Sequence, residues 1–139
     1  MWFSKKQAAA PIGQITTKRR GDAAEVLACA YLTGQGLRLV ERNFNTPGRG
    51  GGEIDLVMRA PDGTLVFVEV RQRSTASHGG AGGSITHAKQ RRIVFAARHY
   101  LMRLATLPPC RFDVVLVQGP TQPAGQQTIE WLQAAFDAS

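Results

Sequence analysis

Acidic residues interrupt two apolar segments of the sequence, Glu53–Ala60 and Thr64–Gln72, both of which are typical of β-strands. Side chains alternate between the two faces of a strand, so each segment has one all-apolar face. The opposite faces carry Asp55 in the first segment and Glu69 in the second. The all-apolar faces must pack on a helix, which leaves the two carboxylates on the faces where chemistry is expected.

The turn between the two segments predicts how the acids meet. Pro61-Asp62-Gly63 suits a three-residue hairpin loop, with Pro and Asp in a type I turn and Gly in the left-handed bulge position. This loop pairs Ala60 with Thr64. Counting back along both strands places Asp55 opposite Glu69, with β-carbons about 5 Å apart.

Two like charges directly opposite one another destabilise a sheet, so this pair needs relief. One carboxyl can keep its proton, a basic side chain such as Arg71 or Arg73 can neutralise the pair, or a divalent cation can bridge it. An arginine would make the pair an inert structural feature, whereas a cation would make it a metal site. The same register places Glu53 opposite Arg71, which predicts a cross-strand ion pair.

The elements that must position these acids follow from apolar periodicity and from turn residues. The predicted elements are a helix from Thr16 to about Gln35, strands over Leu37–Asn43, Glu53–Ala60 and Thr64–Gln72, a helix from about Thr86 to Leu104, and strands over Arg111–Gln118 and Thr128–Leu132. The second helix is long enough to cross over between parallel strands, so a mixed sheet in an α/β protein is expected. Residues 1–15 are predicted to be a loose tail before a single domain over 16–139.

A third acid lies on the first predicted helix. Glu25 stands beside Ala24 and Ala28, at the border of the apolar stripe of that helix. A helix packed on the sheet would aim this side chain at the hairpin. Taken alone, a glutamate in this position is typical of a solvated surface.

The composition favours a polyanionic partner. The 139 residues include 17 Lys and Arg against 10 Asp and Glu, which gives a net charge of +7.

No apolar run is long enough for a signal peptide or a membrane span, so we expect a cytoplasmic protein that does not bind membranes. Cys29 and Cys110 are too few for a disulfide framework or a zinc site, and we expect both to be small buried residues.

Three basic residues open the long predicted helix. Lys89, Arg91 and Arg92 lie within its first two turns, and Thr86 is its predicted cap. Exposed helix amides with three basic side chains suit a phosphate, although a solvated basic face is the alternative. Only four aromatic residues lie between Asn43 and Leu104, too few for a base-stacking platform. Duplex or branched DNA is therefore favoured over single strands.

Taken together, these blocks resemble the YraN family of small bacterial proteins with a restriction-endonuclease-like fold. The matching blocks are Gly52–Leu56, Phe67–Arg71, Thr16–Lys18 with Gly21 and Asp22 before Glu25, Thr86 with Lys89, and Arg111–Val115. The resemblance implies a three-layer core in the order α-β-β-β-α-β-β around a mixed central sheet.

The resemblance also implies a site. It makes Asp55 and Glu69 ligands of Mg²⁺ or Mn²⁺, with Glu25 as a supporting acid in the catalytic and metal-binding group. Arg71 stands where the wider nuclease superfamily has the lysine of a Glu-x-Lys motif. The expected contacts to nucleic acid are Lys89, Arg91, Arg92 and Arg73.

Arg71 departs from that motif. A guanidinium keeps its charge at any workable pH, so it can stabilise a phosphate or hold a water but cannot be a general base. Lys89 is the lysine expected to reach the site from elsewhere. Two functions stay open: a metal-dependent endonuclease-like protein acting on DNA phosphodiesters, and a non-catalytic nucleic-acid-binding protein that retains the fold. A homodimer is kept open as the state of assembly.

Overall fold

The computed structural model describes residues 17–48, 51–73, 85–119 and 128–138. The elements in chain order are α1 (Thr17–Gly34), β1 (Arg38–Asn45), β2 (Glu53–Arg59), β3 (Leu65–Arg73), α2 (His87–Leu101), β4 (Cys110–Gln118) and β5 (Thr128–Phe136). The predicted order is confirmed, with β5 ending at Phe136 rather than Leu132. The predicted tail over residues 1–15 lies outside the described residues. No described helix is both long and apolar enough to cross a membrane.

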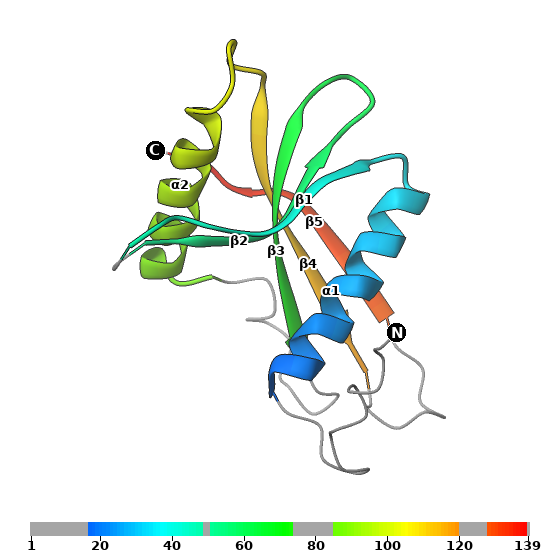
Figure 1. Ribbon diagram of the computed structural model, residues 1–139. Helices are drawn as coiled ribbons and strands as arrows, with labels where there is room; N and C mark the ends of the chain where they lie inside the picture. The colour runs from blue at the N-terminus through cyan, green and yellow to red at the C-terminus, as the bar shows by residue number, and fades with distance from the viewer. Residues whose placement is uncertain (1–16, 49–50, 74–84, 120–127, 139) are drawn as a thin grey trace, which may run out of the picture.

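The five strands form one mixed sheet in the order β1-β2-β3-β4-β5. Strands β3 and β4 are parallel, and the other neighbouring pairs are antiparallel. Helix α2 makes the crossover between the two parallel strands, as expected for that connection. Helices α1 and α2 lie on opposite faces of the sheet, which gives the predicted three layers (Figure 1).

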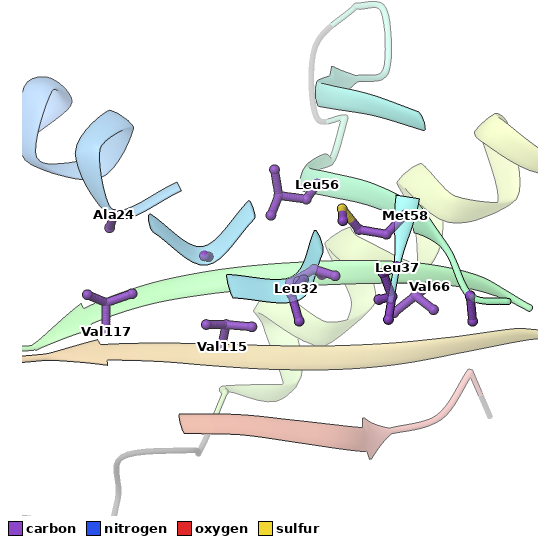
Figure 2. Close-up of a cluster of buried hydrophobic side chains, with 11 residues drawn as sticks. Ala24, Leu32, Leu37, Leu56, Met58, Val66, Val115 and Val117 are labelled. Carbon is purple, nitrogen blue, oxygen red and sulfur yellow. The ribbon is translucent and has the colours of Figure 1, made fainter. Parts of the chain in front are cut away.

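Each face of the sheet has its own apolar core. On the α1 face, Figure 2 shows side chains of α1 above those of the central strands; this core includes Ala24, Ala28, Leu32, Leu56, Met58, Val66, Val68, Val115 and Val117. On the α2 face, the core includes Ile54, Val57, Leu65, Phe67, Ile93, Ala97, Tyr100 and Phe112. Strand β2 is therefore covered on both faces, which explains its unbroken burial from Ile54 to Met58.

The turn between β2 and β3 has the predicted geometry. Ala60 N donates to Thr64 O at 2.8 Å, and Gly63 has a φ of 94°, in the left-handed region that suits glycine. The ladder runs from Arg59–Leu65 to Leu56–Val68, in the register that places Asp55 opposite Glu69.

The predicted Glu53–Arg71 ion pair is wrong. The β2–β3 ladder stops at Leu56–Val68, and Glu53 pairs instead with Asn45 of β1. The described residues show no salt bridge between Glu53 and Arg71. The two strands have already separated where this ion pair was expected.

The start of β2 rests on helix α2. Gly52 N donates to Thr46 Oγ1 at 2.8 Å, which closes the hairpin. A Cβ added at Gly52 would lie 1.9 Å from Arg92 O and 3.3 Å from Ala96 Cβ. The start of β2 therefore packs directly on the backbone of α2, and this contact fixes the position of the helix beside the acidic hairpin.

A buried carboxylate joins β5 to the sheet. Asp113 on β4 is completely buried and accepts hydrogen bonds from Trp131 Nε1 and Ala134 N, both at 2.9 Å, and from Arg111 Nε at 3.0 Å. Ala134 has a φ of 51° where the β4–β5 register shifts. Asp113, which belongs to the Arg111–Val115 block, therefore has a structural role: it holds β5 against β4.

The cysteine prediction holds only in part. Cys29 is half-buried and Cys110 is exposed, and both are free thiols. Cys110 is exposed because it lies at the very start of β4, before the strand enters the core.

Replacing Gly52 by Ala should destabilise the protein, because the added methyl group meets the α2 backbone, which cannot rotate away. We expect the free energy of unfolding to fall by about 1–3 kcal/mol, measured by urea denaturation. Gly34→Ala is the control, since a Cβ there meets nothing within 4 Å. Equal stability of Gly52→Ala and the unmodified protein would contradict the close approach.

Candidate acidic site where β2 and β3 separate

Three carboxylates are buried where β2 and β3 separate. Asp55, Glu69 and Glu25 are 8%, 7% and 9% exposed. They come from β2, β3 and α1, so the three segments singled out from the sequence converge. Asp55 Oδ2 accepts a hydrogen bond from Val70 N at 2.8 Å, so its side chain binds a backbone group of β3 next to the last paired residues of the two strands.

The pKa of Glu69 is raised, as expected for one member of a facing carboxyl pair. Burial, the negative charge of Asp55 and a hydrogen bond between the two carboxyl groups raise the pKa of Glu69 from 4.5 to about 8. The cations of Lys89 and Arg71 act in the opposite direction. The expected raised pKa is thus confirmed, although burial contributes more than the facing charge from which it was predicted.

Glu25 faces the same cluster from α1. Burial, followed by the charges of Asp55 and Asp22, raises its pKa from 4.5 to about 7. Asn43 hydrogen-bonds to its side chain, and Arg42 also favours its charged form. Its Oε1 atom is buried without a hydrogen-bond partner. A buried acceptor of this kind is costly unless it serves a ligand, an ion or a water.

Asn43 was missed as a site residue in the sequence. Its φ is 51°, a backbone conformation that asparagine tolerates better than most residues. An asparagine within a strand, close to the glycine-rich turn, was the available signal.

Lys89 reaches the acids from α2, as expected. Thr86 accepts from Lys89 N at 3.1 Å and caps the helix, which places Lys89 in its first turn. Lys89 Nζ lies 3.6 Å from Glu69 Oε2. The ammonium group therefore stands on the helix side of the pair, while Arg71 lies on the same strand as Glu69.

A polar pocket of about 420 Å³ opens beside Glu69, and we call it the acid chamber. Its lining residues are Glu69, Val70, Arg71, Gln72, Thr86, Lys89 and Arg92. Lys89 and Arg92 are three residues apart, so they share one face of the helix. Helix α2 thus presents two cations to the chamber that contains the acid.

The structure separates Arg91 from this chamber. Arg91 lines a different groove of about 930 Å³, between α2 and the end of β5, together with Phe95, Arg98 and Phe136. The backbone of Arg73 ends β3, and its side chain lies outside the described part of the chain. The three basic residues that open α2 therefore face in two directions.

The donor atoms suit a hard divalent cation, although the structure does not present three ready ligands. Across the described residues, no three Asp, Glu, His or Cys side chains are grouped so that they could hold a metal ion. Two facing carboxylates remain, and Mg²⁺ uses one or two carboxylates, with waters and substrate phosphate completing its shell. The unpartnered Oε1 of Glu25 and the raised pKa values of Glu25 and Glu69 show that this cluster is unfavourable when all its carboxyl groups are charged.

The order of elements and the three layers define this molecule as an α/β protein with a mixed five-stranded sheet between two helices, in the predicted order α-β-β-β-α-β-β. The chain belongs to the family described as Uncharacterised protein family UPF0102, whose model matches residues 24–117. This is the YraN family indicated by the sequence blocks.

Similar proteins extend over the whole chain. The UPF0102 protein of Polaromonas naphthalenivorans (strain CJ2) is 69% identical over 100% of both chains. That of Albidiferax ferrireducens is 65% identical over 88% of this chain and 91% of the relative. Among solved structures, Pyrococcus furiosus SfsA in complex with Ca²⁺ has a TM-score of 0.40 and 13% identity, and the match covers 86% of this chain and 64% of that chain.

Asp55→Asn should stabilise the metal-free protein at neutral and alkaline pH. The folded-state pKa of Glu69 lies above its unfolded value of 4.5, so its ionisation opposes folding as pH rises above 4.5, and fully so above about 8. Asparagine removes the facing charge and keeps an oxygen for Val70 N. We expect the melting temperature to rise by about 5 °C at pH 8, with little change near pH 4.5.

Thermal melts at both pH values test this expectation, with Glu130→Gln on the exposed part of β5 as the control for lost charge. If Asp55→Asn is less stable than the unmodified protein at both pH values, Asp55 is a structural partner of an arginine.

Proposed function

We propose that this protein is a metal-dependent, endonuclease-like protein that acts on phosphodiester bonds of DNA, either duplex or branched. The observation that carries the proposal is the buried Asp55–Glu69 pair at the fork of the hairpin. Protons and cations are the two ways to stabilise such a pair, and the acid chamber gives access to Glu69 beside the basic residues Arg71, Lys89 and Arg92.

In this proposal Asp55 and Glu69 hold Mg²⁺ or Mn²⁺. The bound cation polarises a phosphate and lowers the pKa of a coordinated water. Glu69 must lose its proton to act as a ligand, and the nearby Lys89 ammonium favours that loss.

The other residues of the chamber act on the phosphate and on the water. Lys89 and Arg92 present cations to the non-bridging oxygens of a phosphate in the chamber, and the Arg71 guanidinium can bind the same group with two N–H donors. Glu25, with a pKa of about 7 and an unpartnered Oε1, is suited to hold a water or to accept its proton at neutral pH.

Arg71 favours the second candidate, a nucleic-acid-binding protein that retains the fold without turnover. A guanidinium at this position cannot take a proton from water. Lys89 stands close enough to Glu69 to supply the missing ammonium, which is why we place the catalytic proposal first.

A cleavage screen separates the two candidates. Linear duplex, branched and single-stranded DNA are incubated with Mg²⁺ or Mn²⁺ and with either the unmodified protein or Asp55→Asn. We expect cleavage of duplex or branched DNA by the unmodified protein, and a loss of at least 100-fold in the variant, because the metal loses a ligand. Equal cleavage by both proteins would reveal a contaminating nuclease and remove the catalytic proposal.

A metal-binding measurement supports the screen without depending on turnover. A cation that binds the folded state alone raises the melting temperature by mass action. We expect Mn²⁺ to raise the melting temperature of the unmodified protein at pH 7 and to leave that of Asp55→Asn unchanged. Glu130→Gln should respond as the unmodified protein does.

DNA binding can be assigned to one face of α2 by its salt dependence. Each phosphate contact contributes about 0.9 to the slope of log affinity against log salt concentration. We expect Arg92→Ala to lower the slope by about this amount and Arg91→Ala to leave it unchanged, because only Arg92 lines the acid chamber. The two variants remove the same side chain from neighbouring exposed positions. If neither variant changes the slope from that of the unmodified protein, the basic start of α2 is a solvated face.

A further inference from the structure

A second polar pocket also borders Lys89 and Arg92. It measures about 460 Å³, and we call it the hairpin chamber. Its lining residues are Asn45, Thr46, Gly48, Gly51, Gly52, Glu53, Lys89 and Arg92. One wall is therefore formed by the described residues at the end of β1 and the start of β2, and the other wall by the basic face of α2.

Glycine lets the hairpin wall pack closely on its neighbours. A Cβ at Gly51 would meet Thr46 Oγ1, and a Cβ at Gly52 would meet the α2 backbone. Glycine at position 52 therefore brings the hairpin backbone against α2, so that the two walls of the chamber stand close together. The chamber walls are mostly polar, which suits a hydrated anion better than an apolar group.

Lys89 and Arg92 border both chambers, so the two pockets share a cationic wall. A nucleic-acid strand carries one negative charge for each nucleotide. A strand that has one phosphate in the acid chamber carries its next phosphate one nucleotide further along, and that phosphate also needs a cationic partner. The only described cations bordering both chambers are these two.

We infer that the hairpin chamber binds the phosphate next to the one held in the acid chamber. The site would then take a continuous polynucleotide strand lying across Lys89 and Arg92, and would discriminate against a ligand with a single phosphodiester. This inference rests on the proposed function, because the acid chamber must hold the first phosphate.

Glu53 provides a specific test of this subsite. It is exposed at the start of β2, lines the hairpin chamber and does not line the acid chamber. Its carboxylate opposes a phosphate in the hairpin chamber. Removing the negative charge should therefore strengthen DNA binding, and reversing the charge should add a phosphate contact.

Glu130 is the matched control. It is an exposed glutamate on β5, three strands from β2 in the sheet, or about 14 Å at ordinary strand spacing. At 0.1 M salt this distance exceeds the Debye length of about 10 Å. Glu130→Gln and Glu130→Lys change the net charge as much as the Glu53 variants do, but at a position three strands from β2 and outside the lining of both chambers.

The experiment measures fluorescence anisotropy of a labelled 20-base-pair duplex across a series of salt concentrations, without divalent cations so that no strand is cut. We expect Glu53→Gln to bind about threefold more tightly and Glu53→Lys about tenfold more tightly at 0.1 M salt. The salt slope of Glu53→Lys should steepen by about 0.9. The Glu130 variants should change affinity by less than about twofold.

Equal effects at the two positions would overturn the inference, because Glu53 would then act only through net charge. That result leaves the proposed function standing, since cleavage and the Mn²⁺ response depend on Asp55. Failure of the unmodified protein to bind the duplex would overturn both the inference and the proposed function. If Asp55→Asn loses cleavage but binds the duplex with unchanged affinity, that loss concerns only the acid chamber.

Discussion

The burial of two facing carboxylates is the constraint on which the rest of the site depends. Asp55 binds the backbone of β3 at Val70 N, next to the last paired residues of β2 and β3, and the strands separate there. The opening admits Glu25 from one helix layer and Lys89 from the other. The raised pKa of Glu69 and the Lys89 ammonium beside it both reduce the repulsion within the pair. An otherwise well-packed α/β core thus keeps a buried acidic cluster near its central strand.

Much of this geometry could be predicted from the sequence, because turn chemistry and strand alternation act locally. Pro61-Asp62-Gly63 fixes the hairpin register, and the register alone brings Asp55 opposite Glu69. The same argument failed for Glu53 and Arg71. A register gives the partner each residue would have, but not where the ladder ends. Here the β2–β3 ladder ends at Leu56–Val68, while β2 stays paired with β1 as far as Glu53.

The direction of the helix residues lay beyond local reasoning. Spacing along α2 shows that Lys89 and Arg92 share a face, but which face meets the acids depends on how the helix is rotated about its axis. That rotation is set by a contact distant in sequence, the packing of Gly52 on the α2 backbone at Arg92. Asn43 was missed for a similar reason, since its approach to Glu25 requires β1 and α1 to be packed together.

The two non-glycine residues described with positive φ, Asn43 and Ala134, lie on β1 and β5, the outer strands of the sheet. Both outer strands also have an irregular register with their neighbours. An outer strand with a regular backbone is a template on which another chain can add a strand, the first step toward aggregation. These irregularities interrupt that template at both edges. An irregular backbone at each edge disfavours the addition of a further strand there.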